Sequence, residues 1–330
     1  MSRTRYAILL LLSSALVNTA RCQLGPLDVS FGNNGLFTTG LLPGYQLNED
    51  MALQADGKVV MAGTTCLGQS FDGFLIRLTT SGVLDTSFSQ DGMVFTGDSG
   101  RLDRIMNVAV LADGDILAMG DRAFPYSGTA TMRLNTDGSI DTTYGSGGVE
   151  LLSTTIADNS GMQLLPDGRV LVAGSNNAGV LLEQIMPDGS PDPTFGNAGL
   201  LQLPCVQGSS SPVNFALSPD GRVFVTMPDF VDGDHVSKVF CVFGNGTLDN
   251  SYGNAGCATV NWTVNPVMER LWTIALDASG RIMLGGTVFE NNTYKYLVAR
   301  LTVTGVLDTS FGQAGFAANQ PGDPCSRTFT

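Results

Sequence analysis

Short apolar runs recur along the chain, and each is bounded by glycine, aspartate or serine. Five pairs of runs flank a turn: QADGKVVMAG (54–63), LADGDILAMG (111–120), LPDGRVLVAG (165–174), SPDGRVFVTM (218–227) and DASGRIMLGG (277–286). Apolar runs on both sides of Asp-Gly or Ser-Gly predict β-hairpins. In Leu165–Gly168 and Ser218–Gly221 a proline at the second turn position favours a type I turn that ends in a left-handed glycine.

Each hairpin belongs to a unit of four predicted strands. In the first unit these are Met51–Ala55, Lys58–Gly63, Phe74–Thr79 and Met93–Thr96. The second strand of each unit is apolar without alternation, which indicates a strand covered on both faces. Four-stranded sheets stacked side by side form a β-propeller. A two-sheet sandwich is the alternative, although it would predict cleaner alternation of apolar and polar positions.

A second motif, D-x-S/T-F/Y, occurs six times at intervals of 51 to 59 residues. Its aspartates are Asp28, Asp85, Asp141, Asp192, Asp249 and Asp308, its aromatics Phe31, Phe88, Tyr144, Phe195, Tyr252 and Phe311, and a glycine follows each aromatic four residues later. We call these stretches the aspartate–aromatic segments. The aspartate is expected to bond the nearby backbone and hold a turn, and the aromatic to fill the gap between adjacent sheets.

The aspartates could also pair with arginine. Arg77, Arg133 and Arg300 occupy one slot in the third strand of their units. The third and fourth units carry Gln184 and Cys241 in that slot and still keep the aspartate. We therefore expect the aspartate to hold its turn independently of any arginine.

Residues 25–321 resemble the delta-60 repeat family of bacterial secreted proteins, through LDTSFG (307–312), ADGKVVMAG (55–63) and FLIRLTTSG (74–82). The resemblance implies a β-propeller with an extracellular or cell-envelope location, and it implies no particular activity.

The repeat count predicts the architecture of residues 23–330, which we interpret as a single all-β domain. Five complete units of about 56 residues predict five four-stranded antiparallel blades, and the sixth aspartate–aromatic segment is a partial copy. The surplus segment either caps an edge or marks a shortened form of a six- or seven-bladed ring.

The N-terminal stretch Met1–Cys22 has the charge, apolar core and small-residue zone of a secretory signal peptide. Its removal takes away three arginines and no acid, so the formal net charge falls from −13 to −16. Such acidity disfavours nucleic acid and anionic membranes as partners. We expect a secreted monomer that inserts into no membrane.

Antiparallel connectivity sorts the loops between two faces. The hairpin turns and the turns between third and fourth strands lie at one end, which we call the hairpin face. The connections between second and third strands, and those between units, lie at the other end and differ in every copy; this is the varied-loop face. Candidate ligand-binding residues there are Tyr45, Phe71, Phe124, Tyr126, Phe230, His235, Trp262 and Phe289.

Aromatic side chains in polar loops on a rigid scaffold suit a non-catalytic binding or surface-interaction module for a carbohydrate or protein partner. An alternative is a propeller-type glycoside hydrolase or lyase, which would need two converging carboxylates from acids such as Asp121, Asp229 or Glu269. A purely structural spacer is a third possibility.

Because His235 is the single histidine and no C-x-x-C pair occurs, we expect no metal site, and no cofactor-binding motif is evident.

Overall fold

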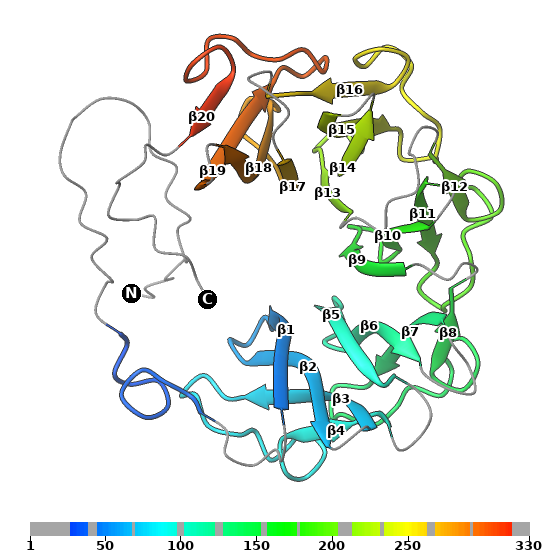
Figure 1. Cartoon of the computed structure of the whole chain (residues 1–330). Coiled ribbons are helices and arrows are strands. Elements are labelled where there is room, and N and C mark those ends of the chain that lie inside the picture. The colour runs from blue at the N-terminus through cyan, green and yellow to red at the C-terminus, as the bar shows by residue number, and fades with distance from the viewer. Residues whose placement is uncertain are drawn as a thin grey trace, which may run out of the picture.

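The computed structural model describes residues 27–38, 45–67, 70–97, 102–122, 128–152, 157–176, 179–203, 213–231, 234–262, 268–290 and 293–318. Within these ranges twenty strands form five four-stranded antiparallel sheets, each made of four consecutive strands. Figure 1 shows the sheets arranged around a common axis as the blades of a propeller. The predicted all-β, five-bladed fold is confirmed. None of the described residues forms a helix long and apolar enough to cross a bilayer.

The first strand of each blade is innermost and the fourth is outermost (Figure 1). Blade 1 is β1 (Tyr45–Leu53), β2 (Val59–Leu67), β3 (Ser70–Leu78) and β4 (Met93–Phe95). Blade 2 is β5 (Arg104–Val110), β6 (Ile116–Arg122), β7 (Gly128–Leu134) and β8 (Val149–Leu151). Blade 3 is β9 (Ala157–Leu164), β10 (Val170–Asn176), β11 (Gly179–Ile185) and β12 (Leu200–Gln202). Blade 4 is β13 (Asn214–Leu217), β14 (Val223–Val231), β15 (Asp234–Val242) and β16 (Cys257–Val260). Blade 5 is β17 (Met268–Leu276), β18 (Ile282–Glu290), β19 (Thr293–Leu301) and β20 (Phe316–Ala318).

The core lies between consecutive blades. Val60 of β2 packs with Ile105 of β5, and Phe224 of β14 packs with Leu271 of β17; all four side chains are fully buried. Both faces of a middle strand are therefore covered, which explains why the second strand of each unit is apolar without alternation.

The strands extend further toward the varied-loop face than the sequence predicts. β2 and β3 stay paired as far as Leu67 and Ser70, so most of the expected loop Thr64–Gly73 is a hairpin. β14 and β15 likewise pair as far as Val231 and Asp234. Backbone hydrogen bonds hold these polar ends together, and such bonds leave no mark on the pattern of apolar residues.

The hairpin turns have the predicted geometry. The N–H of Gly168 donates to the carbonyl of Leu165 at 3.0 Å, and that of Gly221 donates to Ser218 at 2.9 Å. Both glycines have φ of +86°, whereas Asp167 and Asp220 do not have positive φ. A positive φ at the fourth residue alone identifies a type I turn followed by a left-handed glycine, as predicted.

The aspartate–aromatic segments join each blade to the next. The residue after the aromatic donates its N–H to a carbonyl of the following blade, at 2.8 to 2.9 Å. That carbonyl belongs to the turn directly after the third strand, which we call the third-strand turn. The four pairs within the ring are Ser89 to Asp137, Gly145 to Asp188, Gly196 to Asn245, and Gly253 to Thr304. The aromatic packs on the glycine of that turn: a Cβ on Gly138 would lie 2.9 Å from the Phe88 ring. The aromatics therefore fill the gap between sheets, as predicted.

The N-terminal segment makes the same contact without a blade of its own. Gly32 donates to Ser81 at 2.8 Å, and a Cβ on Gly82 would lie 2.8 Å from the Phe31 ring. Phe31 and Phe37 pack against Phe74 of β3. The surplus copy therefore covers the outer part of the face of blade 1 that points away from blade 2.

The aspartates hold their turns through Oδ1 in all six copies, as expected, and in blade 3 the other carboxyl oxygen also takes a cation that the sequence analysis did not identify. In Asp192, Oδ1 accepts the N–H and hydroxyl of Thr194 at 2.8 and 2.7 Å, while Oδ2 lies 2.7 Å from Nη1 of Arg169. Arg169 directly precedes the second strand, β10, whereas the expected slot, Gln184, is in the third strand, β11. Adjacent strands place both slots over the same carboxylate, so either one can supply the cation.

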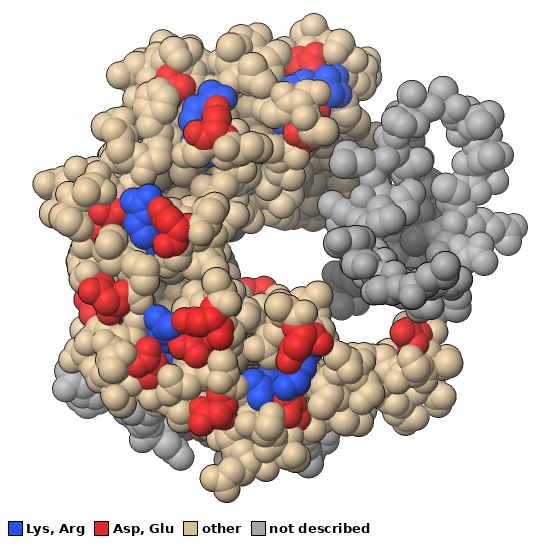
Figure 2. All heavy atoms as spheres, turned by 180° about the vertical axis from the view of Figure 1, so that it is seen from behind, with Lys and Arg blue, Asp and Glu red and all other residues tan. Residues whose placement is uncertain are grey.

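The other blades use one or both slots. Blade 2 uses Arg133 of the third strand, because Asp115 occupies the second-strand slot. Blades 1 and 5 use both: Lys58 and Arg77 contact Asp85, and Arg281 and Arg300 contact Asp308. Figure 2 shows basic side chains beside acidic ones in groups that recur around one face of the ring.

Candidate functional site

Three inner strands carry a β-bulge that leaves one residue unpaired. The register of β1 with β2 shifts at Glu49, that of β5 with β6 at Met106, and that of β17 with β18 at Trp272. A bulge bends the strand and re-aims the extra side chain. All three extra residues line one cavity near the propeller axis.

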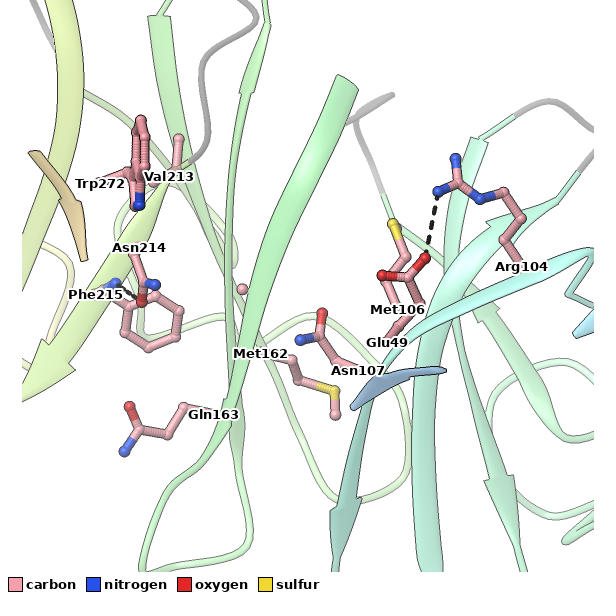
Figure 3. A pocket seen from close by; sticks show the side chains of 11 residues that line it. Glu49, Arg104, Met106, Asn107, Met162, Gln163, Val213, Asn214, Phe215 and Trp272 are labelled. Atoms are coloured by element: carbon pink, nitrogen blue, oxygen red, sulfur yellow. Dashed lines mark hydrogen bonds and ion pairs between the residues drawn. The ribbon is translucent and has the colours of Figure 1, made fainter. Parts of the chain in front are cut away.

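The cavity has a volume of about 550 Å³. Figure 3 shows its lining: Glu49 from β1, Arg104, Met106 and Asn107 from β5, Met162 and Gln163 from β9, Asn214 and Phe215 from β13 with Val213 before it, and Trp272 from β17. Arg104 is the first residue of β5, whereas Met162 and Gln163 are close to the last residue of β9, so the cavity extends along much of the length of the inner strands. Every blade contributes at least one residue.

The charged groups in the cavity neutralise each other. Nη2 of Arg104 lies 3.9 Å from Oε1 of Glu49 (Figure 3), and its Nη1 lies 3.9 Å from Oδ2 of Asp121. The remaining polar groups are the carboxamides of Asn107, Gln163 and Asn214. Oδ1 of Asn214 accepts the N–H of Phe215 at 2.9 Å. The cavity thus offers donors and acceptors with little net charge.

One polar atom in this wall is unsatisfied. Oδ1 of Asn107 is buried and accepts no hydrogen bond from any described residue. A buried acceptor without a donor costs free energy, which a donor from a bound molecule would recover. Asn107 is therefore a candidate polar contact among the residues that line this cavity.

The residues predicted from the varied loops take several positions. Phe124 and Tyr126 lie outside the described residues, and Tyr45 begins β1. Phe230 of β14 is about half exposed, and its ring meets that of His235 across the β14–β15 hairpin at 5.1 Å between centroids. Phe71 of β3 is also half exposed. Phe230, His235 and Phe71 are near the ends of paired strands and not in irregular loops.

Two further predicted residues have ring partners that the sequence analysis did not single out. Trp262 packs edge-on against Phe316 at 5.0 Å and contacts the core between blades 4 and 5. Phe289 of β18 lies 4.7 Å from Tyr294 of β19. The structure therefore brings together Phe230 with His235, but it ties Trp262 and Phe289 to other residues.

Glu269 is the most deeply buried of the loop acids proposed for catalysis, with 1 % of its surface exposed. One carboxyl oxygen accepts the N–H of Trp262 at 2.5 Å, and the other accepts the hydroxyl of Ser237 at 3.4 Å. Burial raises the pKa of Glu269 to about 7, although both hydrogen bonds act to lower it. With both oxygens bonded, Glu269 connects blade 4 to blade 5 and does not line the cavity.

The cavity residues escaped sequence analysis because β1 starts earlier than predicted and because nothing in the apolar pattern marks the bulged positions of the other inner strands. Glu49 fell in an expected loop, and Met106, Asn107 and Trp272 were not singled out. A bulge has no sequence signature by itself. The available clue was a polar residue at corresponding inner-strand positions, such as Asp50, Asn107, Asn214 and Thr273. Within the described ranges, no group of three or more His, Cys, Asp or Glu is placed to hold a metal ion.

Comparison with known solved structures finds distant similarities. A PQQ-bound aldose sugar dehydrogenase from Streptomyces coelicolor is 13 % identical, with 86 % of this chain and 84 % of that chain covered and a TM-score of 0.45. An ulvan lyase of polysaccharide lyase family 25 is 8 % identical, with 82 % and 68 % covered and a TM-score of 0.47. At this level, the similarities say nothing about what this chain binds. None of the curated proteins matches the chain.

A family model described as "Domain of unknown function (DUF5122) beta-propeller" matches residues 54–88, 111–144, 165–195 and 278–311. Each match runs from a hairpin to the following aspartate–aromatic segment, in blades 1, 2, 3 and 5. With these four matched repeats and five four-stranded blades, the chain is a β-propeller repeat protein.

Proposed function

We propose that this protein is a secreted, non-catalytic binding module whose axial cavity takes a neutral carbohydrate. The observation that carries the proposal is the composition of the cavity: three carboxamides, one partly buried indole and a mutually paired Arg104 and Glu49. The delta-60 resemblance and the predicted signal peptide at 1–22 are the grounds for proposing export, and we propose a monomer.

A sugar matches this lining better than an ion or an apolar ligand. Hydroxyl groups both donate and accept, as carboxamides do, and one hydroxyl could donate to the buried Oδ1 of Asn107. The flat apolar surface of a sugar ring can pack on the indole of Trp272. A charged ligand would have to break the Arg104–Glu49 pair. The cavity also favours a binding role over a structural spacer.

The varied-loop face would supply outer contacts for a longer chain. Phe230 and His235 present an aromatic pair at the end of the β14–β15 hairpin. We propose that the other predicted residues of this face contribute in the same way. A protein partner that uses this face alone would not need the cavity, and the experiment below separates the two.

The test is a glycan-array screen with residues 23–330, followed by titration calorimetry with the best ligand. Trp272→Ala and Asn107→Leu should each weaken binding by at least about tenfold, because both remove a contact inside the cavity. Phe243→Ala is the matched control, since Phe243 is exposed on the hairpin face. Binding that survives the double substitution Trp272→Ala and Asn107→Leu, but is lost in Phe230→Ala, would contradict the proposal that the cavity is the binding site. It would indicate that the ligand binds the varied-loop face.

A further inference from the structure

The two ends of the blade array are incomplete in complementary ways. Within a complete blade, the glycine carbonyl of the aspartate–aromatic segment accepts an N–H from the third strand of its own blade. These bonds are Arg77 to Gly92, Arg133 to Gly148, Gln184 to Gly199, Cys241 to Gly256 and Arg300 to Gly315, at 2.8 to 3.2 Å. No described residue donates to the corresponding carbonyl of Gly35. The N-terminal segment has a following blade but no blade of its own.

The last segment has the opposite deficiency. Its glycine carbonyl is bonded within blade 5, but no described residue accepts the N–H of Gly312, which is the counterpart of Gly32, Ser89, Gly145, Gly196 and Gly253. Phe311 is only partly buried, whereas Phe88 and Phe195 are fully buried beneath the next blade. The third-strand turn of blade 1, where a following blade would be expected in a closed ring, already holds Phe31 and Gly32.

The sheet faces at the two ends are also uncovered. Met51 and Leu53 of β1 are 68 % and 71 % exposed. The counterparts of Met51, Val108 and Phe215, are buried against a preceding blade, and those of Leu53, Val110 and Leu217, are partly buried there. At the other end Tyr294 and Tyr296 of β19 are 59 % and 49 % exposed. Figure 1 shows blades 5 and 1 standing apart on this side, and their described strands do not pack together as consecutive blades do.

We propose that the space between blades 5 and 1 is a docking site for one three-stranded β-unit of the same repeat type. Its third strand would donate an N–H to the carbonyl of Gly35, and its turn would accept the N–H of Gly312. Its turn glycine would receive the ring of Phe311. The N-terminal segment would then be the outermost part of this sixth blade. One unit satisfies both deficiencies, and it buries apolar faces of the same kind that form the four existing junctions.

A second copy of the whole chain fits less well. All five of its third-strand turns, at Gly82, Gly138, Gly189, Gly246 and Gly305, already hold an aromatic ring of an aspartate–aromatic segment. A second copy could dock on Phe311 only after one of these contacts broke. The occupant is therefore a free β-unit and not a complete propeller.

The test fuses a second copy of residues 261–305, which carry three strands and a turn glycine, directly after Ala318. Hydrogen exchange is compared with the unfused protein. If the unit docks, exchange at the Gly312 N–H should slow by roughly tenfold or more, because that amide gains a hydrogen bond. Phe311→Ala, or Gly305→Val in the appended copy alone, should abolish the slowing while the five-bladed host stays folded.

Two results would overturn the proposal. One is unchanged exchange at Gly312 in a fusion that is soluble and monomeric. The other is dimerisation of the unfused protein, detected by sedimentation, with Gly312 protected in the dimer. If the fusion aggregates, a peptide of residues 268–305 titrated into the unfused protein provides the same readout: protection of Gly312 that Phe311→Ala removes supports the proposal, and no protection at saturating peptide contradicts it.

Discussion

Nη1 of Arg169, the residue directly before β10, lies 2.7 Å from Oδ2 of Asp192, in the blade where glutamine replaces the arginine of the neighbouring strand. Nη1 of Arg169 also donates to Oε1 of that residue, Gln184, at 2.8 Å. Burial acts to raise the pKa of Asp192, but the Thr194 hydroxyl and the Arg169 guanidinium outweigh it and hold the pKa below its usual value. The cation that contacts the turn aspartate can therefore come from either of two sequence positions in a blade.

Arg169→Gln should therefore destabilise the protein by about 2 kcal/mol, because it leaves a buried carboxylate without its cation. Arg281→Gln is the matched control and should cost less than about 1 kcal/mol, since Arg300 remains 2.8 Å from Asp308. Urea unfolding measures both. Gln184→Arg added to Arg169→Gln should restore most of the loss, and a failure to do so would contradict the equivalence of the two slots.

The aspartates of the turns predict a loss of stability in acid. Their folded pKa values are lowered, for example by the hydroxyl and N–H of Thr143 at Asp141 and of Ser251 at Asp249. A lowered folded pKa stabilises the protein above the unfolded value of about 3.9, and this contribution disappears as the pH falls through the folded value. The urea midpoint should drop below about pH 4. Asp249→Asn should show a smaller drop than the parent protein, and an identical drop would argue against this origin.

Glu269 predicts a pH dependence of opposite sign. Because burial raises its folded pKa to about 7, the protonated form is favoured on folding. Its contribution is fully present below the unfolded pKa of about 4.3 and is lost as the pH rises through 7. Glu269→Gln should therefore gain stability relative to the parent between pH 5 and 8, by about 3 kcal/mol at most. A constant difference across this range would show that Glu269 does not titrate there.

The aromatics of the aspartate–aromatic segments should differ in importance along the chain. Phe195→Ala removes a fully buried ring between blades 3 and 4 and should cost about 3–5 kcal/mol. Phe311→Ala removes a partly buried ring with no following blade and should cost less than about 1 kcal/mol. Thermal unfolding of the two variants provides the comparison. Equal losses would mean that Phe311 is already packed against a partner.

The sequence alone predicted the fold because every blade repeats the same local structure. The turn at Leu165–Gly168, the turn held by Asp192 and the buried Phe195 are each set by residues close in sequence or by an identical neighbouring unit. Periodic spacing then identifies the units and the order of their strands. The varied-loop face follows from antiparallel connectivity alone.

The tertiary structure decided what depends on distant residues. Arg169 reaches Asp192 because β10 and β11 are adjacent, which the slot comparison with Arg133 did not show. Glu49, Met106 and Trp272 face one cavity because their strands bulge and converge on the axis from three blades. The N-terminal copy rests on blade 1, and Phe311 is left without a following blade. Local sequence determines the structure of each blade. The axial cavity and the uncovered faces of the terminal blades form only when the blades pack together.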